Sequence, residues 1–368
     1  MTTSDTPPRS GTPTATVRLR TPAEVMAAVP ALLGFHPERS LVLLCLEGER
    51  GTTMGLVARV DLPPPGDVAA RRAIAGQLAA ICASRAAPAA VVVVVEDRAD
   101  PGRGGVPPHR HLVADLQRAC GSSGTAVVAA HHVVRLLAGQ RWCSYDDDAQ
   151  GLLPDPRACA VAAEHVLAGR VIHRSRAELA ASLQPATPER VREVDRALQT
   201  VTERLESARV PGRLAARGLL ETVLAAVDRC EEGAETAVLT VTELAEVAVA
   251  LGELTVRDAC FALSGGSLAD AAERLWTTLI RNLPAPQRAH PAVLLAHSSY
   301  ARGHGPLAGV ALQVALAADP GHRMAALLTS ALQAALPPQT VRDVAQTARM
   351  IAADLGVCLP PLRWEGSP

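Results

Sequence analysis

The sequence predicts an α/β domain with a mixed sheet, followed by an all-α domain that contains one tetratricopeptide-like helical hairpin. Two patterns indicate this order. In the first half of the chain, short apolar runs alternate with helix-length segments, which is typical of α/β folds. In the second half, nearly every segment has the three- and four-residue spacing of helices. We therefore expect four regions: a disordered tail at 1–15, the α/β domain at 16–185, the helical domain at 186–358 and a C-terminal tail at 359–368.

The first predicted helix begins near Thr21, in the stretch TPAE. The threonine suits the N-cap, the proline suits the first turn, and Glu24 is placed to bond back to the cap. We expect Pro30 to interrupt or restart this helix, because proline removes a backbone donor. Gly34 suits its C-terminal cap.

The sheet is predicted from short apolar stretches. Residues 41–46 and 54–62 are joined by a glycine-containing turn, which indicates a β-hairpin. The five consecutive valines at 91–95 are typical of a strand that is buried on both faces. The remaining elements of this half are a strand from Thr125 and two helices, at about 67–84 and from 108 to about 120.

The helical half begins at Pro188 with an amphipathic stripe that is too short for a sustained coiled coil. The apolar residues of the stripe are Val191, Val194, Leu198, Val201, Leu205 and Ala208. Further helix starts are marked by the polar residues Thr240 and Ser267. A proline-rich break follows at 284–291, and the last helix ends near Gly356.

One segment, 292–320, resembles a single tetratricopeptide-type hairpin. Small residues in it let two helices approach closely, and Asp319 with Pro320 ends the second helix. Because no second copy occurs at that period, we favour an ordinary helical hairpin over a peptide-binding solenoid.

The composition excludes several chemistries. All 36 basic residues are arginine, so a GxxxxGK[ST] phosphate loop and a pyridoxal Schiff base are impossible. The net charge of −1 gives no global field that attracts nucleic acid or an anionic membrane, and we expect neither as a partner. The eight cysteines include no CxxC pair. With no apolar secretion segment and no apolar run near the roughly 18 residues that span a bilayer, we expect a cytoplasmic protein.

The loop FHPERS, residues 35–40, is the foremost binding candidate, through Phe35, His36, Glu38 and Arg39. His36 and Glu38 have the residue types of a proton-transfer pair, and the loop is also suited to a ligand or a partner. The alternative is structural, with Phe35 in the core and a proline that stiffens the turn. We favour the structural alternative, because ligands of open α/β sheets bind beyond the carboxyl ends of strands, whereas this loop enters the amino end of its strand.

Glu96 and Asp97 follow the valine strand and are better placed by that rule. Their carboxylates suit a cation or a ribose hydroxyl, although acidic residues at strand ends more often form a solvated rim. The histidines at 109, 111, 131 and 132 and the aspartates at 146–148 lack the spacing of a metal site. We therefore predict no metal, no cofactor and no catalytic residue.

The stretch RWCSY is a second candidate surface, through Arg141, Trp142 and Tyr145. If these side chains are exposed, they provide a stacking or partner surface. If they are buried, they are the aromatic plug of a core that otherwise consists of leucine, valine and alanine. The sequence leaves both alternatives open.

Three stretches together resemble the domain-of-unknown-function 4192 family of actinobacteria. They are VPALLGFHPERSLVLLCL at 29–46, RWCSY at 141–145 and YARGHGPLAGVALQVALAADPGHRMAALL at 300–328. The resemblance covers nearly the whole chain in order, and it implies a cytoplasmic actinobacterial protein with an α/β part followed by helices. It implies no reaction. Members often carry a Cys-Cys-Pro segment shortly after the Arg-Trp motif, and the sequence DDDAQGLLPDP in that place puts any thiol or metal role there in doubt.

The sequence contains no assembled set of nucleophile, base and orienting group. We therefore predict a non-enzymatic binding or regulatory protein, whose partner is an unidentified protein or small molecule. The alternative is a small-molecule or nucleotide-processing enzyme with its site at the strand edge near Glu96 and Asp97.

Overall fold

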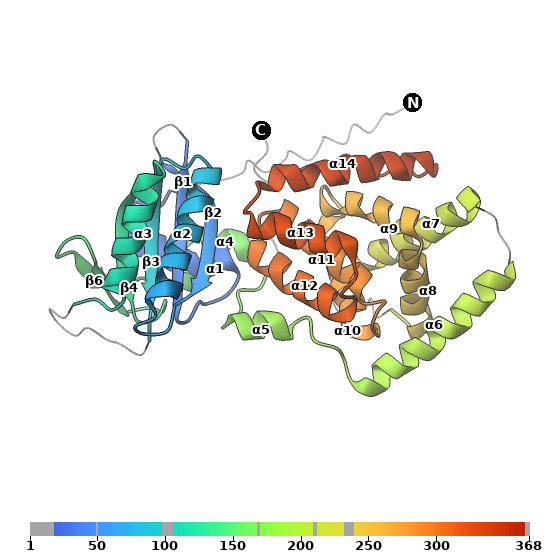
Figure 1. Ribbon diagram of the computed structural model, residues 1–368. Helices are drawn as coiled ribbons and strands as arrows, with labels where there is room; N and C mark the ends of the chain where they lie inside the picture. The colour runs from blue at the N-terminus through green and yellow to red at the C-terminus, as the bar shows by residue number, and fades with distance from the viewer. Residues whose placement is uncertain are drawn as a thin grey trace, which may run out of the picture.

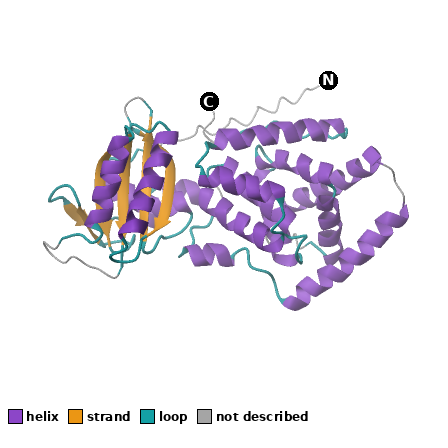
Figure 2. Ribbon diagram, in the orientation of Figure 1, coloured by secondary structure: helices purple, strands orange, loops and turns teal. Residues whose placement is uncertain are grey.

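A computed structural model describes residues 18–48, 51–97, 106–167, 170–208, 212–231 and 239–364. Within these residues the chain forms a mixed six-stranded sheet with flanking helices and then a series of helices (Figure 1, Figure 2). The predicted fold class is therefore confirmed. The tail expected at 1–15 lies outside the described residues.

Helix α1 (Pro22–Leu33) begins as the sequence predicts. The Thr21 hydroxyl accepts the backbone N–H of Glu24, and Gly34 ends the helix with a φ of +75°, a conformation that glycine adopts without strain. The prediction that Pro30 interrupts this helix is wrong, because α1 continues through Pro30 to Leu33. Proline costs the helix one backbone hydrogen bond, and the burial of Pro30 and its neighbours in the core offsets that cost.

The sheet has the strand order β2-β1-β3-β4-β5-β6. The strands are β1 (Ser40–Glu47), β2 (Thr53–Asp61), β3 (Ala89–Val95), β4 (Ala126–Val133), β5 (Arg141–Ser144) and β6 (Gln150–Leu152). Strand β1 is antiparallel to β2 and β3, whereas β3 and β4 are parallel. Ser40 at the start of β1 pairs with Val95 at the end of β3, and Val95 pairs with Val133 at the end of β4. The loop before β1 therefore lies at the edge where β3 and β4 end.

Helices α2 (Val68–Ser84) and α3 (Arg110–Ser122) cover one face of the sheet (Figure 1). Alternate residues of the strands point to the two faces, as the pleat requires. Leu41, Leu43, Val92 and Val94 pack under α2 and α3, whereas Val42, Leu44, Val91 and Val93 pack on the opposite face with α1. This second core continues without interruption into the helical part.

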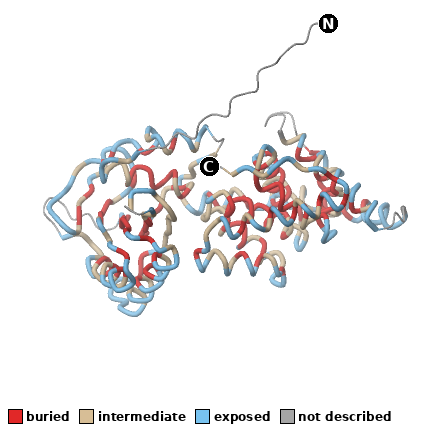
Figure 3. Tube along the Cα trace, turned by 90° about the horizontal axis from the view of Figure 1, so that it is seen from above, coloured by how far each residue is buried: buried red, intermediate tan, exposed pale blue. Residues whose placement is uncertain are grey.

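Short helices lead from the sheet to the helical part. They are η1 (Pro156–Ala158), α4 (Ala160–Leu167) and α5 (Arg176–Ala181). The helical part then comprises α6 (Pro188–Ala208), α7 (Gly212–Glu231), α8 (Val241–Gly252), α9 (Leu254–Cys260), η2 (Phe261–Ser264), α10 (Ala269–Asn282), α11 (Ala289–Ala301), α12 (Gly305–Ala318), α13 (Arg323–Gln333) and α14 (Pro338–Asp354). Figure 3 shows that buried stretches run through the interior of both parts, while exposed stretches lie on the outside.

The helix starts expected in this half differ in accuracy. Thr240 forms a complete capping box with Glu243 at the start of α8, as predicted. Ser267 is not a cap, because the N-cap position of α10 falls on Leu268, whose backbone is already close to helical. In the stripe along α6, Val194 and Val201 are buried but Leu205 is exposed, so only the first part of the stripe packs against the core.

Helices α11 and α12 form the expected helical hairpin, joined by a turn in which Gly303 has a φ of +83°. The likeness of this hairpin to a tetratricopeptide unit stays a prediction. Among the helices of the described ranges, none has both the length and the apolar character that a membrane crossing requires.

Candidate functional site

Two pockets meet at the segment that joins α4 to α5. We call residues 170–174 the linking segment, and its backbone is bonded to the loop before β1. The His36 N–H donates to the carbonyl of His173 at 3.0 Å, and the His173 N–H donates to the carbonyl of Gly34 at 2.9 Å. Arg170 and Val171 line both pockets. The loop and the linking segment therefore form one hydrogen-bonded wall between two cavities.

The first cavity, which we call the edge pocket, has a volume of about 770 Å³. Its wall is made by residues 36–38 of the loop, residues 135–137 after β4, η1, α4 and the linking segment. Four arginines line it: Arg135, Arg157, Arg170 and Arg174. Glu38 is the carboxylate among its lining residues.

The position of the edge pocket corrects the reasoning from strand polarity. We expected the loop with His36 to lie at the wrong end of the sheet, because it enters the amino end of β1. Since β1 is antiparallel to β3, that amino end lies beside the carboxyl ends of β3 and β4. Ligands of α/β sheets bind at this edge. The two sites that the sequence offered as rivals, near His36 and near Asp97, therefore lie at the same edge.

His36 is half-buried, and its position is fixed by the protein. Nδ1 lies 3.2 Å from the carbonyl of Leu136, and we assign the ring proton to Nδ1 because only a donor binds a carbonyl. Burial lowers the pKa of His36, the bond to Leu136 raises it, and the charge of Arg157 lowers it further. The ring is therefore neutral at pH 7, with Nε2 as a hydrogen-bond acceptor.

The two carboxylates after β3 have different environments. Asp97 lies 3.6 Å from Arg135, which places it beside the edge pocket. Glu96 is buried, and its carboxylate lies 3.1 Å from Nε2 of His109. Glu96 is therefore not part of a solvated rim, whereas Asp97 is exposed, as acidic residues at strand ends usually are.

The other two candidates in the loop lie away from the edge pocket. Phe35 is 1% exposed and packs in the core between the sheet and the helical part, as the structural alternative expects. Arg39 is exposed and has a φ of +43°, which is unusual for a residue other than glycine. Its carbonyl accepts the N–H of Leu62, so Arg39 serves to turn the chain into β1.

Of the two alternatives for RWCSY, the structure supports the buried one. Trp142 is 8% exposed and packs edge-to-face on His131, with ring centres 5.2 Å apart. Tyr145 packs under the opposite face of the sheet and donates its hydroxyl to the carbonyl of Pro108 at 2.6 Å. Arg141 is exposed. These residues do not form a common surface.

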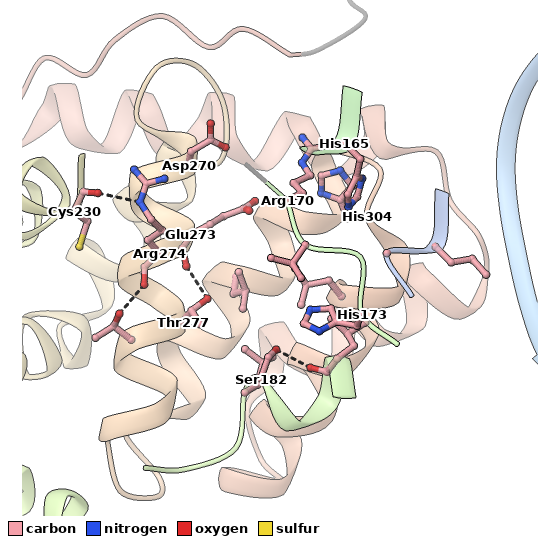
Figure 4. Close-up of a pocket in the computed structure, with 18 of the residues that line it drawn as sticks. His165, Arg170, His173, Ser182, Cys230, Asp270, Glu273, Arg274, Thr277 and His304 are labelled. Carbon is pink, nitrogen blue, oxygen red and sulfur yellow. Dashed lines mark hydrogen bonds between the residues drawn. The ribbon is translucent and has the colours of Figure 1, made fainter. Parts of the chain in front are cut away.

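The second cavity, which we call the junction pocket, lies between the sheet part and the helical part (Figure 4). Its volume is about 550 Å³. The apolar part of its wall consists of Leu32, Leu33, Val171, Leu179, Leu183, Leu295 and Leu307. In Figure 4, the polar side chains come from α10 on one side, from His165, Arg170 and His304 at one end, and from His173 and Ser182 at the other.

Both carboxylates of the junction pocket are paired with one buried arginine. Arg302, whose side chain is 8% exposed, lies 2.7 Å from Asp270 and 3.2 Å from Glu273. Ser298 donates a further hydrogen bond to Glu273 at 2.7 Å. On the same helix, Arg274 donates to the carbonyl of Cys230. The charges on this side of the pocket are thus largely compensated by the protein itself.

The two histidines at one end of the junction pocket are neutral at pH 7. His165 and His304 lie edge-to-face with ring centres 6.4 Å apart. Burial lowers the pKa of both rings, most strongly that of His304, and the charge of Arg170 lowers both further. Neutral imidazoles can accept or donate a hydrogen bond without attracting a counter-ion.

The sequence did not indicate the junction pocket, since its residues come from segments far apart in the chain and share no motif. One signal was available at its wall. The stretch from Arg170 to Arg176 carries three arginines and a histidine within seven residues, between two helices. A dense run of basic residues at a connection is unusual enough to single out. Within the described ranges, no group of three His, Cys, Asp or Glu side chains is arranged to hold a metal ion.

A family model described as "Domain of unknown function (DUF4192)" matches residues 22–339. No curated protein and no solved structure matches the chain.

Proposed function

The chain belongs to the DUF4192 family, and we propose that it is a non-enzymatic protein that binds a small organic molecule in the junction pocket. The matched residues, 22–339, include the lining of both pockets, and the description of the family names no reaction. The bound molecule acts as the regulatory signal. The loop before β1 and the linking segment transmit its binding from one part of the protein to the other.

One observation carries this proposal: a cavity of about 550 Å³ that lies between the sheet part and the helical part, with an apolar wall and a few polar groups. Ligand pockets in proteins typically have roughly 300–1,000 Å³, are mostly apolar and lie at the junctions of domains. The junction pocket has each of these properties. Its wall is also built from both parts, so an occupant contacts α1 and α10 together.

The wall indicates the kind of molecule. Six leucines and a valine favour an apolar body, because burial of apolar surface stabilises the complex by roughly 25 cal/mol per Å². The neutral rings of His165 and His304 provide hydrogen bonds at one end. Asp270 and Glu273 are paired with Arg302, and Arg274 on the same helix balances the second negative charge. We therefore expect an amphipathic molecule whose polar end carries hydroxyl, carbonyl or amide groups.

The experiment is a fragment screen by ligand-observed NMR on the full-length protein and on a variant whose junction pocket is filled. Thr278 lines the pocket, and its hydroxyl bonds the carbonyl four residues earlier. Thr278→Trp places a ring in the cavity, and we expect it to abolish the binding of hits. Thr200 makes the same bond on α6 outside the pocket, so Thr200→Trp is a matched control that keeps binding. Hits that bind both variants equally contradict the proposal.

A second candidate function, the enzyme at Glu96 and Asp97, is favoured by one observation. His109, which contacts the buried Glu96, has a φ of +57°. Such backbone strain costs roughly 1–3 kcal/mol and is concentrated at functional sites. A buried carboxylate that orients an imidazole is the arrangement of a general base.

The second candidate is tested by activity. The full-length protein is assayed with p-nitrophenyl acetate and with nucleoside triphosphates, alongside Glu96→Gln and His109→Gln. The enzyme hypothesis expects turnover that falls at least a hundredfold in both variants while their circular dichroism stays unchanged. Turnover that is absent, or equal in all three proteins, rejects it.

A further inference from the structure

We propose that the groove along the free edge of β2 binds an extended peptide segment of another protein, which adds to the sheet as a further strand. We call this groove the strand groove, and its volume is about 680 Å³. The inference goes beyond the junction pocket, because it concerns a different surface and a different class of partner. It rests on three observations: the free backbone groups of β2, the two walls beside them and the charge of the groove.

The outer side of β2 carries backbone groups that can pair with another strand. β2 is at the end of the strand order, so only its inner side pairs with a strand, β1. Directly after β2, the N–H of Leu62 donates to the carbonyl of Arg39 at 2.9 Å. In antiparallel strands, every second residue directs its N–H and C=O away from the neighbouring strand. Counted from the bond of Leu62, the outward groups are those of Val57, Arg59 and Asp61. Within the described ranges, these outward groups form no backbone hydrogen bond.

Helices flank the free edge of β2 on both sides. On the face of the sheet that α2 covers, the strand groove is lined by Ile74, Leu78 and Ile81. On the opposite face it is lined by Gly309 of α12 and Leu332 of α13. Figure 1 shows β2 at the edge of the sheet that faces the helical part. Alternate side chains of an added strand point to opposite faces, so one set contacts α2 and the other contacts α12 and α13.

The space beside β2 suits one strand rather than a second folded sheet. Residues 56–61 of β2 line the groove, a length of about 17 Å at roughly 3.4 Å per residue. A second copy of the chain carries the same helices beside its own β2, so the two β2 edges cannot approach to hydrogen-bonding distance. An extended segment carries no such helices. Addition of a peptide to a sheet edge is a common mode of recognition, in which main-chain hydrogen bonds provide the affinity.

The charge of the strand groove favours a peptide with an acidic side chain. Its charged lining residues are Arg59, Asp61 and Arg176. Arg59 and Asp61 form an ion pair at 2.7 Å and compensate each other. Arg176 is exposed and donates a hydrogen bond to the side chain of Gln313 at 3.2 Å. In the part of the chain that the structure describes, Arg176 forms no ion pair. One positive charge is therefore left for the partner, and a carboxylate complements it.

The test measures binding of fluorescein-labelled, C-terminally amidated peptides to the full-length protein by fluorescence anisotropy. The peptides are VTVEVT, its neutral analogue VTVTVT, and VTVEVT with every backbone nitrogen methylated. We expect saturable binding of VTVEVT, with VTVTVT at least threefold weaker. The methylated peptide keeps the side chains but loses all donors to β2, so we expect it to bind at least tenfold more weakly. In hydrogen-exchange mass spectrometry, bound VTVEVT is expected to slow the exchange of residues 53–61 at least fivefold.

Two substitutions test the two sides of the argument. Gly309→Trp places a ring in the strand groove and is expected to abolish binding of VTVEVT. Gly218→Trp is the matched control, since Gly218 is an exposed glycine of α7 with open space around an added Cβ atom, and it is expected to change binding less than twofold. Arg176→Gln leaves the backbone of β2 unaltered. We expect it to weaken VTVEVT to the level of VTVTVT and to leave VTVTVT unchanged.

Four outcomes overturn the inference: no saturable binding of VTVEVT, equal affinity for the methylated peptide, unchanged exchange in residues 53–61, or unchanged affinity in Gly309→Trp. Sedimentation velocity tests the other occupant. If the full-length protein binds no peptide and self-associates, and Gly309→Trp makes it monomeric, a second copy fills the groove and the inference fails.

Thr278→Trp separates the strand groove from the junction pocket. The two linings have only Leu33 in common, so Thr278→Trp fills the junction pocket and is expected to leave peptide binding unchanged. If Thr278→Trp abolishes binding of VTVEVT, the peptide lies in the junction pocket and the inference fails. If VTVEVT binds with the expected pattern while no fragment binds the junction pocket, the proposed function fails and this inference stands.

Discussion

At the scale of single residues, Trp142 shows how a chain with 2% aromatic residues uses one large ring. Its indole fills the space beside His131 and lies against Gly151, where an added Cβ atom would stand 2.9 Å from the indole nitrogen. Glycine at that position of β6 is therefore needed for space. The sequence could not choose between an exposed and a buried ring, because the choice depends on which face of the sheet β5 presents to the helical part.

We expect Trp142→Ala to lower the free energy of unfolding by about 3–5 kcal/mol, since it removes a buried ring and leaves a cavity. Trp142→Phe is expected to cost less than half as much. The indole N–H has no hydrogen-bond partner among the described residues, so the phenyl ring gives up little beyond volume. Urea denaturation monitored by circular dichroism measures both values. Equal losses in the two variants would show that the N–H, rather than the volume, matters.

The residues of the loop before β1 also show what a sequence does and does not specify. The structural roles of Gly34 and Phe35 follow from local chemistry, and the structure confirms them. His36 was singled out, but its bonds to Leu136 and to the linking segment join distant parts of the chain. No local pattern encodes such a contact.

At the scale of elements, the capping box of α8 was predictable because all of its atoms lie within four residues. We expect Thr240→Ala to lower the free energy of unfolding by about 1 kcal/mol, because the N–H of Glu243 loses its acceptor. Thr240→Ser keeps the hydroxyl and serves as the control, with a change within about 0.5 kcal/mol. Thermal and urea unfolding of the three proteins test this. A Ser variant as unstable as the Ala variant would contradict a capping role.

The ion pairs between α10 and Arg302, which follows the end of α11, give a second prediction at this scale. Arg302→Met leaves Glu273 as a poorly compensated carboxylate of low exposure, and we expect a loss of about 3–5 kcal/mol in unfolding free energy. Asp270 is the other carboxylate that pairs with Arg302, and its side chain is 57% exposed. We therefore expect Asp270→Asn to lower the free energy of unfolding by less than about 1 kcal/mol. Urea denaturation compares the two. A larger loss for Asp270→Asn than for Arg302→Met would refute this assignment of the buried charge.

Element-scale errors in the sequence prediction have one physical cause. Pro30 was expected to break α1, and the start of β1 was expected to lie at the wrong end of the sheet. Both inferences used local rules, whereas burial of α1 decides the first and the antiparallel pairing of β1 with β3 decides the second. The order of elements from α1 to β4 was predictable, because it depends mainly on hydrophobic periodicity.

At the scale of the whole molecule, buried histidines link stability to pH. Burial lowers the pKa of His290 and His297 from 6.5 to about 4, and it also lowers the pKa of His304 well below 6.5. In the unfolded chain these rings take up protons near pH 6.5, before the folded protein does. The stabilisation from keeping them neutral is therefore complete above pH 6.5 and is lost as the pH falls toward about 4.

We expect the free energy of unfolding to decrease steadily between pH 7 and pH 5 in urea titrations. His297 is fully buried and donates Nε2–H to the carbonyl of Val341, so its contribution across the full window is about 3 kcal/mol. His297→Gln removes one titrating group, and its curve is expected to be flatter over the same range. Parallel curves for the two proteins would mean that His297 does not contribute.

The whole-molecule features that the sequence did not reveal are the two cavities. A cavity depends on how distant segments are oriented, and the junction pocket draws on α1 near residue 33 and on α12 near residue 304. The edge pocket combines three connections that are each unremarkable in the sequence. Only the arginine-rich stretch of the linking segment lines both pockets and could also be recognised in the sequence.

The pair of backbone bonds between the loop and the linking segment has a consequence for folding. These two bonds join residues 34 and 36 to residue 173, so their formation closes a long loop and costs conformational entropy. We therefore expect them to form late in folding. A fragment that ends at Leu167 lacks His173 and leaves the carbonyl of Gly34 and the N–H of His36 without these partners. Such a fragment is expected to populate a partly ordered state, whereas a fragment extended to residue 185 contains both partners of the two backbone bonds.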